Sequence, residues 1–486
     1  MSKPDTQLDS NALGLLTTAA LTAAYMAPAL SVYALFGPMV GQAGIGVGFV
    51  MLLALLMTLP SAVSFGMLAR EMPSAGGVYA WASRALGSGA GIWAGITTAT
   101  YYVLTVFFPP IVFGQFLNEL LARLGVAPST WTLLGGALLA LALTGAVTYR
   151  GIVVSSRLAF AMLMTELAVV VALGATFLVL AAVEGRFTWA PVAPPTTGSE
   201  WAAVFAALPM ALLAMVCDAA TPTSEETRDA RRTIPLAVVT TCVLIGVWYV
   251  VGFSAFALAA PREEILRLAA EPDANIAAPL AERAWGAMHI LVTITGMTAA
   301  LGALVPCSTA ASRVLFAMGR DGTLPRWLSA VHPRYKAPWN AFHVVYLTTI
   351  VAVSVVALAV GANQTVTWWG NVVGWYIATV YILANLSNVV FHRRFGDGRL
   401  HLVWNLLVPL VGIAAPLLVV WQQIIVGMSR KGWFGRSGQV FIVVATLASA
   451  LYAYRRAHAN GADGTGLAEA GSDRASGLPQ GPSRVL

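Results

Sequence analysis

A chain of 486 residues in which 58% are hydrophobic and only 10% are charged cannot enclose its apolar surface in one water-soluble core, since soluble domains carry about 25% charged residues. The net charge of +7 would suit nucleic-acid binding, but the basic residues are scattered between apolar runs and form no dense patch. We therefore predict an all-α integral membrane protein whose basic loops set its orientation in the lipid bilayer, with no nucleic-acid partner.

Apolar segments long enough to cross a bilayer recur along the chain. We predict about twelve transmembrane helices, over residues 13–36, 42–68, 88–121, 130–148, 158–182, 201–220, 235–260, 286–317, 340–360, 365–390, 402–426 and 436–454. They form a transmembrane domain over 12–456, preceded by a short segment, 1–11. Residues 457–486 are rich in Gly, Ala, Ser, Asp and Pro, which predicts a disordered tail. The polar insert 261–284 predicts either short surface helices that cap a vestibule or a plain solvated loop.

The distribution of Lys and Arg predicts the orientation. If the N-terminus is cytoplasmic, most basic residues fall in cytoplasmic loops: Arg70, Arg84, Arg150, Arg157, Arg228, Arg231, Arg232, Arg320, Arg326, Arg334, Lys336, Arg393, Arg394 and Arg399, with Arg455 and Arg456 at the start of the tail. The opposite side holds mainly Arg262, Arg267, Arg283, Arg430, Lys431 and Arg436. The positive-inside rule then places both termini in the cytoplasm of a multi-pass protein of the cell membrane.

The first span contains a candidate helix break in the segment LTAAYMAPALSVYALFG, where Pro28 and Ser31 fall near the midplane. The helix after the break would present unpaired N–H groups to a carboxylate or another acceptor. Ala27, Pro28, Ala29 and Ser31 are therefore candidate substrate-binding residues. The alternative is a proline kink that only shapes packing, since Pro is common in spanning helices.

The sixth span contains a second break, in LLAMVCDAATPTSEET, where Pro222 and small polar residues disfavour a continuous helix. A broken helix inside a membrane survives only where its backbone lines a cavity. Asp218 would there meet a substrate ammonium, or else accept backbone N–H bonds and hold the break together. Met215 and Cys217 beside it are further candidates. Paired breaks in the first and sixth spans occupy matching places if spans one to five and six to ten are repeats, which is typical of a transporter site.

Other candidates lie on the third and fifth spans. Glu166 is surrounded by apolar residues in the middle of the fifth span, where an ionisable group indicates function. Together with Asp218 it is a candidate proton-coupling residue, and the alternative is a Glu satisfied by a neighbouring Ser or Thr. Tyr101 and Tyr102 are candidate contacts for a cation, although such rings more often serve packing. Glu119, near the end of the third span, is expected to be solvated.

Several classes of protein are disfavoured. The sequence has no GxxxxGK[ST] motif, which argues against ATP-driven pumping. The six His and three Cys residues form no metal-binding spacing and no catalytic constellation, so we expect no cofactor, no metal and no enzyme activity. A membrane receptor that does not transport remains a remote alternative.

Three segments then resemble a known superfamily: FGMLAREMPSAGGVYAWASRALG at 65–87, CDAATPTSEETRDARRTIPLAVV at 217–239 and SRVLFAMGRDGTLPRWLSAVHPRYKAPWNA at 312–341. In this order they are similar to the amino acid–polyamine–organocation superfamily over roughly residues 12–425, and closest in motif to putrescine importers and GABA- or choline-type permeases. The resemblance implies the leucine-transporter-type fold, with two inverted five-helix repeats plus two helices, and alternating access around a site between broken helices one and six. Members occur as monomers and as homodimers.

The chain departs from the superfamily pattern at three places. Val216 and Cys217 stand where many members carry a Gly and an aromatic residue before the acid. Glu166 falls near a position that is basic in several permeases. The segment Ala27–Ser31 replaces a Gly-Ser-Gly stretch that binds an amino acid carboxylate in many relatives. We therefore predict a proton-coupled importer of a small amine, polyamine or amino acid, with a tilt toward the amine. The alternative is an obligate amine or amino acid exchanger.

Overall fold

The computed structural model describes residues 7–270, 276–360, 362–395, 401–429 and 433–462. Within these residues the chain is helical, and an isolated bridge between Leu13 and Thr227 is the one extended pairing. The helices of the first half are α1 (Leu15–Met26), α2 (Pro28–Ala43), α3 (Val47–Glu71), α4 (Val78–Leu86), α5 (Ser88–Arg123), α6 (Thr130–Thr148) and α7 (Ile152–Val183). The second half contributes α8 (Gly198–Ala214), η3 (Asp218–Glu226), α9 (Ala230–Ala257), α10 (Arg262–Ala270), α11 (Ala277–Trp285), α12 (Ile290–Arg320), α13 (Trp339–Val360), α14 (Ala362–Phe395), α15 (Val408–Ser429) and α16 (Trp433–Ala462).

Ten stretches of the described residues are long and apolar enough to cross a membrane. The first, Leu15–Glu71, contains α1, α2 and α3, and the apolar part of α13 falls just below the length of a span. The all-α membrane fold is thus confirmed, whereas the number twelve stays a prediction. Residues 463–486 of the predicted tail and the predicted basic residues Arg399, Arg430 and Lys431 lie outside the described residues.

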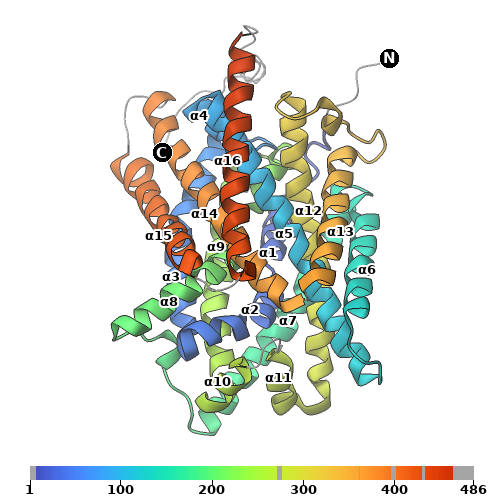
Figure 1. Ribbon diagram of the computed structural model, residues 1–486, viewed down its shortest axis with the longest axis vertical. Coiled ribbons are helices and arrows are strands. Elements are labelled where there is room, and N and C mark those ends of the chain that lie inside the picture. The colour runs from blue at the N-terminus through green and yellow to red at the C-terminus, as the bar shows by residue number, and fades with distance from the viewer. Residues whose placement is uncertain (1–6, 271–275, 361, 396–400, 430–432, 463–486) are drawn as a thin grey trace.

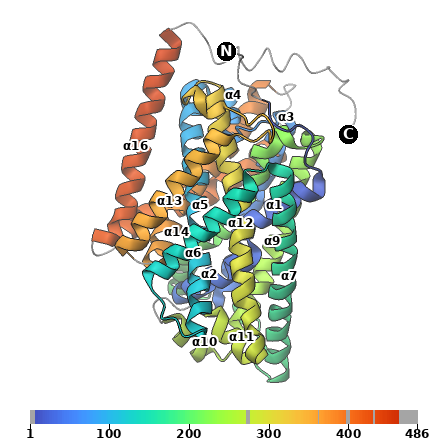
Figure 2. The same ribbon diagram turned by 90° about the vertical axis from the view of Figure 1, so that its right-hand side faces the viewer.

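The outer helices present large apolar side chains to their surroundings. Leu244 on α9, Leu347 on α13 and Leu447 on α16 are each more than 60% exposed. Soluble monomers do not expose contiguous apolar surface on this scale, whereas lipid tails solvate it without cost. The arrangement is therefore a bundle whose polar groups face inward and whose rim faces lipid. Figure 2 shows α16 at one side of the bundle, where the Tyr452 hydroxyl donates to the carbonyl of Thr323 at 2.7 Å.

The bundle pairs corresponding helices of its two halves. The second span, α3, packs along the seventh, α9, and the third span, α5, packs along the eighth, α12. The first span lies against α7, α9 and α12 in the middle of the bundle (Figure 1). This pairing is what two inverted repeats produce, and it encloses both broken spans.

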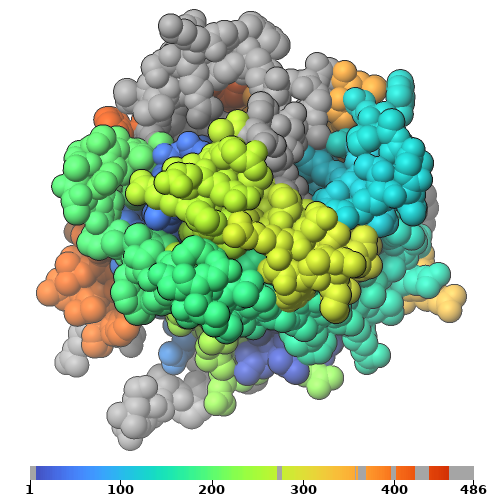
Figure 3. All heavy atoms as spheres, turned by 90° about the horizontal axis from the view of Figure 1, so that it is seen from below, coloured from blue at the N-terminus to red at the C-terminus, as the bar shows by residue number. Residues whose placement is uncertain are grey.

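The insert at 261–284 forms two short helices, α10 and α11, so that the described part of it is not a plain loop. Both pack against α2, the second half of the first span. Figure 3 shows the face they cover, where the yellow-green and yellow surfaces of α10 and α11 run across it. They lie at the end of the bundle opposite α4 (Figure 1).

Close helix packing between α5 and α6 depends on Gly114. A Cβ atom at this position would lie 2.3 Å from the carbonyl oxygen of Leu133. We expect Gly114→Ala to destabilise the protein by about 1–3 kcal/mol, because the backbone of α6 would have to move. The measurement is the thermal unfolding temperature in detergent. Gly135→Ala on α6 is the control, since nothing lies within 4 Å of its added Cβ; equal effects of the two changes would contradict this account.

Candidate functional site

The first break is centred on Ala27. This residue has φ 51° and ψ 67°, a left-handed conformation that ends α1 and starts α2, and that costs a non-Gly residue free energy. The carbonyl of Met26, which the break frees, accepts hydrogen bonds from the Ser31 hydroxyl at 2.9 Å and from the Tyr249 hydroxyl. The predicted break is therefore a true interruption of the helix, with its backbone satisfied by side chains.

The second break follows α8. The chain leaves the α-helix at Met215 and continues as the 3₁₀ segment η3. The amide of Cys217 donates to the Tyr381 hydroxyl at 3.4 Å, and the Thr221 hydroxyl donates to the carbonyl of Asp218 at 2.8 Å. As at the first break, side chains form hydrogen bonds with backbone groups that have no partner within the α-helix. The predicted pair of interrupted spans is present in the structure.

Asp218 joins the two breaks through tyrosines. Its carboxylate is fully buried and accepts hydrogen bonds from the Tyr101 hydroxyl at 2.9 Å and the Tyr102 hydroxyl at 2.7 Å. The Tyr25 hydroxyl, in the last turn of α1, donates to the Tyr101 hydroxyl at 2.9 Å and to Thr105 at 3.3 Å. A polar chain thus runs from the first broken span, across α5, to the sixth.

A small cavity lies beside this chain, between the two broken spans. Its free volume is about 40 Å³, which holds a few water molecules but no larger solute without rearrangement. Its wall is apolar apart from a few groups, among them Tyr25, Ser31, Thr105 and Cys307. Trp369, whose ring stacks on Phe108 with centroids 4.4 Å apart, closes another part of the wall.

The predicted site residues divide into two groups. Ala27 and Ser31 line the cavity. The others are not among its lining residues: Pro28, Ala29, Tyr101, Tyr102, Met215, Cys217 and Asp218. Between Met215 and Cys217 it is Val216 that reaches the cavity.

Sequence reasoning missed Tyr25 and Thr105. Both line the cavity. A tyrosine three residues before a proline in the middle of an apolar span was the available signal for Tyr25.

Glu166 lies on α7, where its side chain is only 2% exposed. Among the described residues its buried Oε2 atom has no hydrogen-bond partner. The expected alternative, satisfaction by a Ser or Thr, is therefore incomplete for this group. Glu119, by contrast, is partly exposed, and binds Arg123 at 3.4 Å and Thr293 at 3.0 Å.

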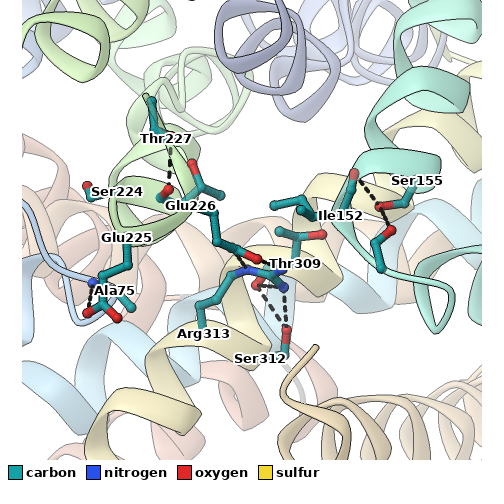
Figure 4. A network of polar contacts seen from close by, with 12 residues as sticks. Ala75, Ile152, Ser155, Ser224, Glu225, Glu226, Thr227, Thr309, Ser312 and Arg313 are labelled. Atoms are coloured by element: carbon teal, nitrogen blue, oxygen red, sulfur yellow. Dashed lines mark hydrogen bonds and ion pairs between the residues drawn. The ribbon is translucent and has the colours of Figure 1, made fainter. Parts of the chain in front are cut away.

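A second polar cluster lies where η3 ends (Figure 4). Glu226 and Arg313 of α12 form a doubly hydrogen-bonded ion pair, at 2.6 and 2.9 Å, with both side chains less than 5% exposed. The neighbouring Glu225 makes a similar pair with Arg320, at 2.8 Å for both bonds, and also accepts from the amide of Ala75 at 3.0 Å.

This cluster also holds the N-terminal segment. The carbonyl of Glu226 accepts from the amide of Leu13 at 3.0 Å, and the amide of Arg228 donates to the Leu13 carbonyl at 2.8 Å. The end of the sixth span is therefore bound to the eighth span, to the α3–α4 connection and to the start of the first span. We name Glu225, Glu226, Arg313 and Arg320 the carboxylate–arginine latch.

Breaking the buried ion pair between Glu226 and Arg313 should lower the stability of the protein. Arg313→Met leaves the Glu226 carboxylate buried without a cation, and we expect a loss of about 3–5 kcal/mol in stability. Arg283→Met is the matched control, because Arg283 pairs with Glu264 at 3.1 Å on the surface, where both side chains are at least 40% exposed, and such pairs contribute about 0–1 kcal/mol. Thermal unfolding in detergent compares them; an Arg313 variant as stable as the control would contradict the assignment.

Comparison with known proteins identifies the family to which the chain belongs. The model of the family described as "Amino acid permease" matches residues 13–451. The chain belongs to this family. It is 24% identical over 422 residues to the branched-chain amino acid permease BcaP of Lactococcus lactis, covering 83% of this chain and 88% of that protein. It is 26% identical over 330 residues to the low-affinity putrescine importer PlaP of Escherichia coli, covering 65% of this chain and 68% of that protein.

Other similarities are shorter or structural. An uncharacterised transporter of Mycobacterium tuberculosis is 34% identical over 194 residues, which is 39% of either chain. A crystal structure of a manganese transporter variant from Eremococcus coleocola superposes with a TM-score of 0.54 at 12% identity, covering 91% of this chain and 94% of that one. It supports the transporter fold alone. The protein is thus a multi-pass membrane permease, as the sequence resemblance predicted.

Proposed function

We propose that this permease is a secondary active transporter that imports a small amine, polyamine or amino acid by alternating access. The observation that carries the proposal is the buried Asp218 between two interrupted helices, joined through tyrosine hydroxyls to a cavity that both breaks border. Intramembrane acids are expensive and mark substrate or ion pathways. The relatives named as an amino acid permease and a putrescine importer agree with a substrate that carries an amine.

The proposed binding mode uses the polar chain. An ammonium group entering the cavity would meet Tyr25 and Thr105 first, with Asp218 one hydroxyl further. Rotation of Tyr101 would bring the carboxylate into direct contact with the cation. Aromatic faces such as that of Trp369 add cation–π attraction. The apolar remainder of the wall suits a short carbon chain.

The proposed transport cycle uses the latch. It closes one end of the bundle, while α10 and α11 lie over α2 at the other end. Opening a path from the site toward the latch requires that η3 and α12 separate, which breaks two ion pairs. A fold of this kind is expected to open its two ends in turn, so that one end is closed while the other is open.

Protons are the proposed coupling ion. Asp218 and Glu166 are both buried carboxyl groups near the two breaks, and each can hold or release a proton as the site changes its exposure. Whether the protein works as a monomer or homodimer does not enter this mechanism.

Uptake by proteoliposomes tests the function. Radiolabelled putrescine, GABA, choline, arginine and leucine are offered with and without an inward proton gradient. Accumulation of one substrate only with the gradient supports a proton-coupled importer. Uptake indifferent to the gradient would remove proton coupling, and uptake only into preloaded vesicles would identify an exchanger. Binding without any uptake would identify a receptor and contradict transport.

Asp218→Asn tests the site residue. The change keeps the shape and removes the charge, so a charge-assisted bond of about 1.5–3 kcal/mol is lost and uptake should fall about 10- to 100-fold. Glu282→Gln on the exposed side of α11 is the control and should leave uptake unchanged. Wild-type uptake by the Asn variant would remove Asp218 from the mechanism.

We further propose that both termini face the cytoplasm. The described ends meet at one end of the bundle: Leu13 binds Arg228, and Arg456 of α16 donates to the carbonyl of Gly322 at 2.7 Å. Most of the predicted cytoplasmic arginines flank the same connections, as the positive-inside rule requires. Epitope tags at either terminus should be digested by protease only in inside-out vesicles; digestion in intact cells would reverse the orientation.

A further inference from the structure

Five aromatic rings meet at one end of the helix pair α6 and α13. Tyr149 directly follows α6, and the others come from the connection between η5 (Arg326–Ser329) and α13 and from the start of α13: His332, Tyr335, Trp339 and His343. The Tyr149 ring lies edge-on to three of them, with centroid distances of 5.5, 5.7 and 6.0 Å. Trp339 completes the group, 6.2 Å from His332 and 5.8 Å from His343. We name these five residues the aromatic cluster.

His332 holds the connection before α13 in one shape. Its Nδ1 atom accepts hydrogen bonds from the amides of Arg334 and Tyr335, both at 3.2 Å, and its own amide donates to the carbonyl of Ala337 at 2.9 Å. The guanidinium group of Arg334 lies over the Tyr335 ring, 5.5 Å from its centroid, which is a cation–π contact. The position of this arginine is therefore set by the aromatic cluster.

The two segments that form the aromatic cluster contribute positive charge and no negative charge. Residues 120–165 and 322–396 contain no Asp or Glu. Three exposed arginines lie in or next to the turns that carry the cluster, namely Arg150, Arg326 and Arg334. None of the ion pairs among the described residues involves them. A surface with several cations and no paired acid attracts an anion.

Apolar side chains continue from the aromatic cluster along the outer faces of α6 and α13, which pack against each other (Figure 2). Leu143 on α6 is 47% exposed and Leu347 on α13 is 64% exposed. They lie about 9 Å from Tyr149 and about 12 Å from Trp339 along the helix axes, at 1.5 Å per residue. Trp339 is itself 37% exposed, and Trp and Tyr are typical of the boundary between lipid and water. Cations and rings therefore lie at headgroup depth, above apolar surface at the depth of acyl chains.

We propose that the aromatic cluster, with Arg150, Arg326 and Arg334, binds the headgroup of an anionic phospholipid whose acyl chains lie along α6 and α13. Arginine binds phosphate oxygens through paired N–H donors, and basic pockets at the ends of spanning helices bind anionic headgroups. A lipid fits better than a soluble anion because the apolar faces adjoin the cations. The lipid bridges the turn between α6 and α7 and the connection before α13. This surface lies outside the centre of the bundle, so the inference does not depend on the transported substrate.

Lipid titration of the delipidated protein in detergent, followed by native mass spectrometry, tests the binding. Dioleoylphosphatidylglycerol should occupy its first site at a concentration at least about fivefold lower than dioleoylphosphatidylcholine, which has the same acyl chains and no net charge. Arg150→Gln and Arg334→Gln should each weaken binding of the anionic lipid about fivefold, since one basic side chain near the headgroups contributes about 1 kcal/mol. Arg262→Gln, exposed on α10 at the opposite end of the bundle, is the control and should leave binding unchanged. Equal binding of the two lipids, or equal effects of the Arg334 and Arg262 changes, overturns the proposal.

Photo-crosslinking tests where the lipid lies. Phosphatidylglycerol with a diazirine in one acyl chain should label peptides of α6 and α13 in the unaltered protein. Equal labelling of the other outer helices overturns the assigned surface. Glycerol 3-phosphate, which has the anionic group but no acyl chains, should fail to displace the lipid at equal concentration; complete displacement would show that a soluble anion occupies the surface and would overturn the lipid assignment.

Discussion

Interrupting a helix inside a bilayer frees backbone N–H and C=O groups that have no water to bind, and every such group costs several kcal/mol if it stays unpaired. The organisation of this permease follows from that constraint. The Met26 carbonyl is bound by Ser31 and Tyr249, and the η3 backbone is bound by Thr221 and Tyr381. Because these side chains come from the broken spans themselves and from α9 and α14, the site is assembled from helices far apart in sequence.

The two polar clusters of η3 have different physical roles. At its start, the Asp218 carboxylate accepts from two tyrosine hydroxyls, and none of the ion pairs among the described residues involves it. At its end, Glu225 and Glu226 are each matched by an arginine in fork-like geometry, which is the strong form of an ion pair. A nine-residue segment thus carries one acid that accepts hydrogen bonds from tyrosine hydroxyls and two acids that are paired with arginines.

The sequence alone was sufficient for the features that depend on composition or local pattern. The spans follow from apolar runs, and both breaks follow from Pro and small polar residues, since these are local signals. Asp218 and Glu166 were recognisable because charge in an apolar segment is conspicuous. The partners of these acids were not: Tyr25 meets Tyr101 across 76 positions, and Glu226 meets Arg313 across 87. Such contacts depend on how the helices pack, which no local pattern encodes.

The spacing of the latch residues along the chain has a mechanical consequence. The two acids are adjacent in sequence, whereas Arg313 and Arg320 are seven residues apart on one α-helix, about 10 Å along its axis at 1.5 Å per residue. For Glu225 to pair with Arg313, or Glu226 with Arg320, η3 would have to move along α12 by this whole distance of about 10 Å in one step. Between Arg313 and Arg320, α12 carries no Lys or Arg that either carboxylate could bind. The spacing therefore favours two states of the latch, one with both ion pairs formed and one with both broken, over a series of states in which the pairs exchange partners.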